Sequence, residues 1–242
     1  MIKFFRRIRQ KLVSQNKFSK YMFYAIGEII LVVIGILIAL QVNTWNVDRL
    51  NGLEEERILR DLKEEIGPAI AKRDELILKV EQKRREFAIV LDKLFSSPAR
   101  TLSDKDCINI WNMVYLRDYN VPYLSVVEEL ITSGNISIVK DPELRKQMMV
   151  FKNRSKINAE KFIKEADEIP NYSTEYPNLI IRSWEPSAQK SIYTCDAPGI
   201  TKNKQFLAQL QSDRGKIRGL VIAARSELKI LKKMDSLINT SN

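Results

Sequence analysis

The chain has 242 residues, with 40 lysines and arginines against 30 aspartates and glutamates, no histidine and two cysteines. The lack of histidine excludes Ser-His-Asp and Cys-His catalytic systems and histidine metal ligands, and two cysteines are too few for a four-thiolate metal site. The length suits a membrane anchor followed by one soluble domain, or a single large domain.

The first 20 residues form a basic segment with an apolar stripe. They contain seven basic residues and no acidic one. Phe5, Ile8 and Leu12 recur at helical spacing, which predicts an amphipathic cytoplasmic helix lying on an anionic membrane surface. A solvated basic leader and a nucleic-acid-binding segment are the alternatives.

A transmembrane signal-anchor helix is predicted over residues 21–46. Residues 21–40 contain one charged side chain, Glu28, and such a stretch of twenty residues is long enough to cross about 30 Å of hydrocarbon. A cleaved signal peptide fits poorly, because the apolar region is too long and no small-x-small cleavage site comes after it. Basic and aromatic residues at its two ends are expected to anchor it at the membrane–water interfaces: Arg6, Arg7, Lys20, Tyr21, Tyr24 and Trp45.

The charges on either side of this span predict its orientation. Basic residues precede it, whereas acidic residues such as Asp48 and Glu54 dominate the segment on its C-terminal side, so the N-terminus should stay in the cytoplasm. Residues 21–242 hold 33 basic and 30 acidic side chains. The high net charge therefore reflects membrane topology, and binding of nucleic acid is not expected.

One face of the predicted span carries polar and small residues. Gly35 and Ala39 form a small-x-x-x-small pair, which lets two helix backbones approach closely, and they share this face with Glu28. A carboxyl group in apolar surroundings must be protonated, paired or directed into a polar cavity. The side chains that could serve an intramembrane interface are Glu28, Gly35, Ala39, Gln41, Asn43 and Asn46.

Three interpretations of Glu28 are open. It can face the axis of a homo-oligomeric helix bundle that conducts ions or protons. It can extend toward the cytoplasmic headgroups, or it can pair with a different membrane protein.

Beyond the span, the apolar positions keep a helical period. A long helix is expected over residues 47–98, with a break at Gly67-Pro68, where proline removes a backbone donor. It is either a coiled-coil-like stalk or a long helix within a bundle. Residues 99–242 are expected to form a helical periplasmic domain, with helices from Ser103, between Asn120 and Gly134, from Asp141 to about Glu168, and from Thr201 to about Ile238.

The predicted fold class is therefore all-α: one N-terminal transmembrane helix, then a long helix and an exported helical bundle. No strand of useful length is expected; Ile136–Ile138 gives only a weak alternating pattern.

The two cysteines, Cys107 and Cys195, can join in a disulfide if the domain is exported. Closing so long a loop would contribute about 4 kcal/mol in the chain-entropy model. The alternative is that both are small buried apolar side chains.

Aromatic residues gather between Asn171 and Gly199, a stretch that also contains three prolines. Tyr172, Tyr176, Trp184 and Tyr193 can line a groove for a peptide, glycan or partner protein, or they can pack this stretch onto the helices beneath it.

No sequence motif indicates catalysis or a cofactor. The chain contains no G-x-G-x-x-G, P-loop, C-x-x-C or H-E-x-x-H pattern. Asp104 and Asp106 can touch a cation, but acids at the start of a helix are the simpler interpretation. We expect no enzyme activity, no metal and no cofactor.

Two stretches carry a family resemblance. Residues 27–46 read GEIILVVIGILIALQVNTWN, and residues 128–145 read EELITSGNISIVKDPELR. They resemble a family of uncharacterised single-pass membrane proteins from Gram-negative bacteria, known by a domain-of-unknown-function label. The resemblance implies an inner-membrane anchor with a helical exported domain, and it implies no activity.

The leading functional hypothesis is a single-pass inner-membrane protein whose periplasmic domain is a structural or protein-interaction module. Its expected partners are the lipid bilayer and either a second copy of the chain or another membrane or periplasmic protein. The alternative is a homo-oligomeric channel, or a force- or ion-coupling component, that uses Glu28.

Overall fold

The computed structural model describes residues 18–96, 101–111, 121–168 and 172–240. The predicted basic segment therefore lies almost entirely outside the described residues. The chain divides into two compact units, Met1–Glu56 and Arg57–Asn242, and helix α2 (Phe18–Phe95) contributes to both.

In the first unit, α2 carries a long apolar stretch. An 18-residue window has a mean hydropathy of 2.6, and none of it is buried inside the chain. A helix of this length and composition can cross a bilayer. This part of α2 is therefore a candidate membrane span.

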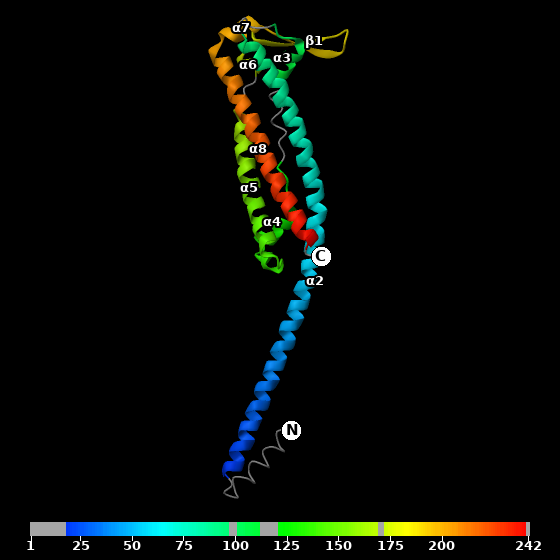
Figure 1. Cartoon of the computed structure of the whole chain (residues 1–242), viewed down its shortest axis with the longest axis vertical. Coiled ribbons are helices and arrows are strands. Elements are labelled where there is room, and N and C mark those ends of the chain that lie inside the picture. The colour runs from blue at the N-terminus through cyan, green and yellow to red at the C-terminus, as the bar shows by residue number, and fades with distance from the viewer. Residues whose placement is uncertain (1–17, 97–100, 112–120, 169–171, 241–242) are drawn as a thin grey trace. The chain divides into compact units, whose positions relative to one another are not determined.

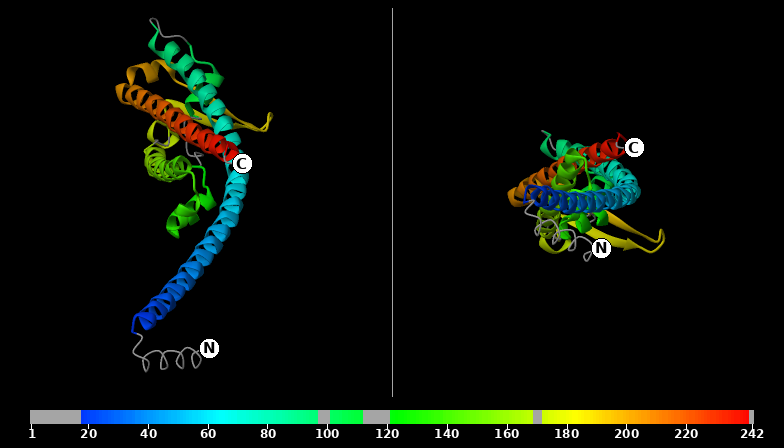
Figure 2. Two further views of the ribbon diagram at one scale, coloured as in Figure 1. Left: turned by 60° about the horizontal axis from the view of Figure 1, so that its bottom comes forward. Right: turned by 90° about the horizontal axis from the view of Figure 1, so that it is seen from below.

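The second unit is built mainly of helices (Figures 1 and 2). After α2 the described elements are α3 (Asp104–Trp111), α4 (Ser125–Thr132), the short 3-10 helix η2 (Asn135–Ile138), α5 (Pro142–Asp167), α6 (Tyr172–Glu175), β1 (Ile180–Glu185), β2 (Lys190–Cys195), α7 (Ala197–Lys202) and α8 (Lys204–Thr240). The prediction of an all-α fold is confirmed, with one small hairpin added.

Helix α8 lies between α5 and the second half of α2 (Figure 1). Polar contacts between α2 and α8 show that they are antiparallel, because the residue numbers on α8 fall as those on α2 rise. The contacts join Lys63 to Asn239, Asp74 to Lys232 and Glu81 to Arg225.

The starts of the helices are explained by local side-chain chemistry. Asp141 precedes α5, and its Oδ1 accepts hydrogen bonds from the backbone N–H groups of Glu143 and Leu144, at 2.8 and 3.1 Å. Asn203 caps α8 in the same way, with Phe206 as the donor at 2.9 Å. These caps satisfy N–H groups that have no partner within the helix.

The apolar core of the domain is divided into two clusters. The Phe87 cluster, named after its α2 residue, also takes Ile110 from α3, Ile200 from α7 and Phe206 from α8. The Leu62 cluster is formed by α2, α4, α5 and the last turns of α8. Leu144 comes from α5, and Leu231 and Met234 come from α8. Residues of α8 are needed for both clusters.

The predicted helix break at Gly67-Pro68 is wrong, because α2 continues through Pro68. A proline removes one hydrogen bond from a helix, at a cost of about 3 kcal/mol. Gly67 and Pro68 are exposed, while Ile66 and Ala69 on either side are buried in the Leu62 cluster. Packing of these neighbours offsets the loss.

A β-hairpin occupies part of the region in which no strand was expected. Strands β1 and β2 pair antiparallel, from Ile180 opposite Cys195 to Glu185 opposite Lys190. Gln189, in the connecting turn, has a φ of 48°, in the left-handed region that tight turns use. Most side chains of both strands are exposed or half-buried. The alternation that usually reveals a strand is therefore missing.

Candidate functional site

The residues predicted to form an intramembrane interface lie on α2 in the first unit. Helical geometry places Glu28, Gly35, Ala39 and Asn46 within about 40° of one another around the axis. All are exposed within the chain, and a side chain at Gly35 would meet nothing within 4 Å.

Two further members of the predicted set lie differently. Asn43 is adjacent to this face, whereas Gln41 lies on the opposite side of the helix, since about 100° per residue separates consecutive positions. The structure therefore does not bring Gln41 together with Glu28.

The predicted interface anchors are described only in part. Tyr24 and Trp45 are exposed on α2. Lys20 and Tyr21 belong to the helix, but their side chains lie outside the described residues, as do Arg6 and Arg7 entirely.

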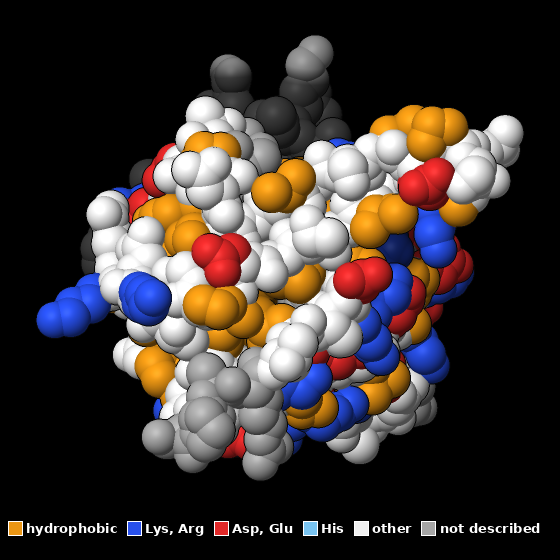
Figure 3. All heavy atoms as spheres, turned by 90° about the horizontal axis from the view of Figure 1, so that it is seen from above, with side chains coloured by type: hydrophobic (Ala, Val, Ile, Leu, Met, Phe, Trp, Pro, Cys, Tyr) orange, Lys and Arg blue, Asp and Glu red, His pale blue; other side chains and the backbone are white. Residues whose placement is uncertain are grey.

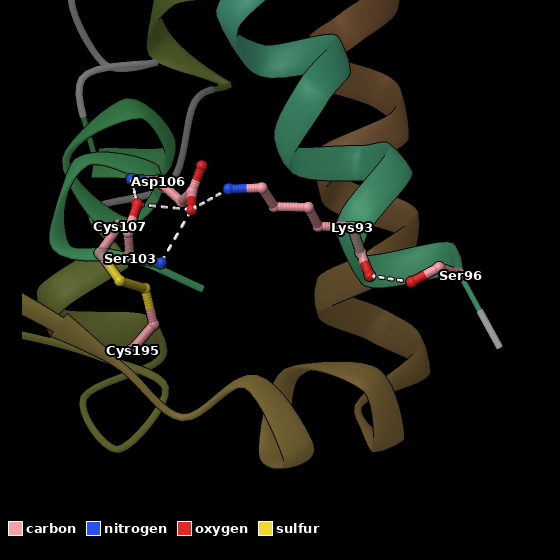
Figure 4. A network of polar contacts seen from close by, with 6 residues as sticks. All are labelled: Lys93, Ser96, Ser103, Asp106, Cys107 and Cys195. Carbon is pink, nitrogen blue, oxygen red and sulfur yellow. Dashed lines mark hydrogen bonds and ion pairs between the residues drawn. A yellow bond between two sulfur atoms is a disulfide. The ribbon is translucent and has the colours of Figure 1, made fainter. Parts of the chain in front are cut away.

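In the second unit, a disulfide joins Cys107 of α3 to Cys195 of β2 across 88 positions of sequence, with the two Cα atoms 5.7 Å apart (Figure 4). The bond fastens the β-hairpin to the helices. Trp111 of α3 and Tyr193 of β2 pack against each other, with ring centroids 5.4 Å apart.

Next to the disulfide, Asp106 is the centre of a polar network (Figure 4). Its Oδ2 accepts hydrogen bonds from Lys93 Nζ at 2.6 Å, and from the backbone N–H and hydroxyl of Ser103 at 2.8 and 2.6 Å. Ser103 Oγ in turn accepts from the backbone N–H of Asp106 at 3.3 Å, which makes a reciprocal cap for α3. The network also ties the end of α2 to α3.

This network sets the pKa of Asp106. Burial alone would raise it, but the hydrogen bonds from Lys93 and Ser103 outweigh burial and hold the pKa below its usual value. The carboxylate is therefore charged and structural. Within the described parts of the chain, no group of three or more acidic or cysteine side chains could hold a metal ion.

A buried polar layer separates the two apolar clusters. Arg73 of α2 forms an ion pair with Glu227 of α8, with Nη1 and Oε2 3.3 Å apart. Asn158 of α5 donates to Glu227 Oε1 at 2.6 Å, and Ser155 is buried one turn earlier. One layer thus contacts all three long helices of the domain.

This layer was not predicted, although the sequence carries a signal for it. Arg73 lies four residues after the buried Ala69, and Glu227 lies three after the buried Ala224, so each is on the apolar face of its helix. A charge on such a face needs a partner.

A second buried polar group lies near α6. The hydroxyl of Tyr172 donates to Asp213 of α8, which also accepts from Gln209 at 2.9 Å and lies 3.6 Å from Lys216 Nζ. Burial raises the pKa of Asp213 above its usual value, and burial beside that carboxylate raises the pKa of Tyr172.

The aromatic residues of this region do not form a single groove. Tyr172 and Tyr176 are buried against Phe206, with ring centroids 5.6 and 4.7 Å from it. Trp184 is 63% exposed on β1. Hydrophobic side chains are visible on the projecting lobe of the hairpin, seen from this end of the domain (Figure 3).

A groove of about 580 Å³ lies along α2 in the second unit. Its lining mixes acidic, basic and apolar side chains, including Glu65, Lys72, Lys79 and Tyr123. A lining of this mixed character does not indicate one chemical class of ligand.

Comparison with known proteins identifies one relationship. Residues 28–106 match a family of unknown function (DUF6090). No curated protein and no solved structure matches the chain. The match runs from the apolar part of α2 into α3 and supports an uncharacterised domain family.

Proposed function

We propose that this chain is a single-pass membrane protein of the bacterial inner membrane, with a helical periplasmic domain that acts as a structural or protein-interaction module. The observation that carries the proposal is the apolar stretch of α2, none of which is buried inside the chain. A stretch of this length that the described residues of the chain leave uncovered is suited to lipid.

The charge asymmetry around the span supports the orientation. Basic residues lie before it and acidic residues after it, which favours a cytoplasmic N-terminus. The disulfide between Cys107 and Cys195 agrees with this orientation, since such bonds persist in oxidising compartments.

The polar chemistry of the domain supports an interaction role over an enzymatic one. The buried titratable groups hold helices together: Asp106 links α2 to α3, Glu227 links α2, α5 and α8, and Asp213 links α6 to α8. These groups are committed to structural contacts.

Membrane fractionation and protease access test the anchor and its orientation. The full chain should stay with the membrane pellet after alkaline extraction. In spheroplasts, external protease should digest the domain while a tag at the N-terminus survives. Release by alkali, or protection of the domain in intact spheroplasts, would contradict the proposal.

Cross-linking before solubilisation tests the interaction role. Partners other than a second copy of the chain, captured by the full chain, should be lost when residues 57–242 are deleted, with the remaining anchor still inserted. Capture of the same partners by the anchor alone would show that the domain is not the interaction module.

A further inference from the structure

The face of α2 that carries small and polar residues within the predicted span continues beyond it and becomes apolar there. From residue 39 onward, small, amide and leucine side chains recur at alternating steps of four and three residues: Ala39, Asn43, Asn46, Leu50 and Leu53. This is the spacing of the a and d positions of a coiled coil. We name these five residues the α2 seam.

The last two seam residues lie past the predicted span. Leu50 is 50% and Leu53 is 55% exposed within the chain. The side of the helix away from the seam is polar, at Thr44, Asp48 and Asn51. The helix is therefore amphipathic just past the predicted span, and the described part of the chain leaves Leu50 and Leu53 about half exposed on its apolar side.

We propose that a second copy of the chain covers the α2 seam, in a parallel two-helix coiled coil. This inference rests on the proposed function, because two copies inserted in one membrane with the same orientation must pair in parallel. Leu50 and Leu53 then pack against their counterparts. Asn43 and Asn46 meet the same amides of the other copy, a pairing that fixes register and favours a defined number of strands.

Charges beside the seam fit a parallel pair. With Leu50 at position a, Arg49 occupies position g and Glu54 occupies position e of the next heptad, and these positions face each other across a parallel coiled coil. Within one helix the same two side chains lie about 140° apart around the axis, so they cannot pair in the chain itself. Arg49 Nη2 donates to Asn46 Oδ1 at 3.4 Å, which holds the guanidinium beside the seam.

The pattern also predicts where the pairing ends. The next facing pair would bring Glu56 opposite Asp61, two acids that repel. Ile58 and Leu59 are already buried in the domain of their own chain. The paired segment therefore ends near Leu53.

Disulfide trapping tests the α2 seam directly. Both native cysteines are joined to each other, so one introduced cysteine is the only free thiol of the full chain. Leu50→Cys and Leu53→Cys place the thiol in the seam, and the matched controls Asp48→Cys and Glu55→Cys place it on the outer face. After mild oxidation in native membranes, we expect severalfold more covalent dimer from the seam variants.

A reciprocal charge exchange supplies a second measurement. In the Leu53→Cys background, Arg49→Glu should lower the dimer yield severalfold, because it brings two acids together at each facing pair. Adding Glu54→Arg should restore the yield. Relative to this background, the charge exchanges alter no seam residue and leave the helix propensity of the segment nearly unchanged.

The outcomes separate this inference from the proposed function. The protein can stay in the alkali-extracted membrane while the seam and outer variants cross-link equally or not at all. This result would refute pairing through the α2 seam and leave the proposed membrane anchor supported. Failure of Glu54→Arg to restore the yield would also overturn the parallel pairing. Release of the chain by alkali would overturn the anchor, and with it the parallel orientation.

Discussion

Arg73 and Glu227 form an ion pair in the middle of the domain, between two apolar clusters, where their side chains are 4% and 0% exposed. Removing one partner of such a pair leaves a buried charge uncompensated. We expect Glu227→Gln to lower the free energy of unfolding by about 3–5 kcal/mol. Urea denaturation of the protein in detergent, monitored by the loss of helical circular dichroism, measures this change in the free energy of unfolding.

Replacing the whole layer should be far less costly. The triple variant Arg73→Met, Asn158→Leu and Glu227→Leu exchanges buried polar groups for apolar ones, and such exchanges are often neutral or stabilising by about 1–4 kcal/mol. Glu75→Gln, in an exposed pair with Lys79, is the control and should leave the free energy of unfolding almost unchanged, because solvent screens the pair. A triple variant as unstable as Glu227→Gln would refute this prediction.

The disulfide should contribute strongly to stability. It closes a loop of 88 residues, which corresponds to about 4–5 kcal/mol in the chain-entropy model. The double variant Cys107→Ser, Cys195→Ser should lose about this amount. Its stability should no longer respond to reducing agent, whereas that of the wild type should fall toward the variant's value. A wild type unaffected by complete reduction would contradict the prediction.

The capping network of α3 should give stability a defined pH dependence. Because the pKa of Asp106 is lowered in the folded state, its contribution is present above the unfolded pKa of about 3.9 and is lost as pH falls through the folded pKa. We expect Asp106→Asn to cost about 1–3 kcal/mol at neutral pH. The cost should shrink below about pH 4 in a denaturation series, and a constant difference at all pH values would be inconsistent with this role.

Asp213 should have the opposite pH dependence. Burial raises its pKa in the folded state, so its charged form is disfavoured there and stability falls as pH rises above about 3.9. Asp213→Asn removes this titration while keeping an acceptor for the Tyr172 hydroxyl. The wild type should therefore lose stability relative to this variant between about pH 4 and neutrality.

Tyr172→Phe is the informative companion variant. The hydrogen bond from Tyr172 lowers the pKa of Asp213 against the effect of burial. Loss of this hydrogen bond should therefore extend the pH dependence of stability to higher pH.

For the Asp213→Asn prediction, the contradicting outcome is that wild type and variant have the same dependence of stability on pH. The Asp213 carboxyl would then not titrate between about pH 4 and neutrality.

The long helices of the domain could be predicted because each carries its own local signals. Asp141 before Pro142, for example, predicts a helix start, and the structure places α5 there. The effect of Pro68 was mispredicted because its cost is local, whereas the packing that overrides it comes from α4, α5 and α8. Tertiary contacts of this kind cannot be predicted from the residues near Pro68 in the sequence.

The polar contacts were harder to predict for a related reason. Ser103 and Asp106 lie three residues apart, so their mutual cap could be inferred, but Lys93 joins them only through the fold. Tyr172 and Asp213 are 41 residues apart and carry no motif. Their pairing depends on how α6 is packed onto α8.

The contribution of α8 to both apolar clusters has a consequence for biosynthesis. A chain emerging from the ribosome presents α2, α4 and α5 before α8 exists, so neither cluster can be completed until the 37-residue helix α8 has been made. Cys195 precedes that helix and can already have joined Cys107. The nascent domain is thus tethered at one end while its apolar faces are still uncovered, the stage at which it most needs a holding chaperone.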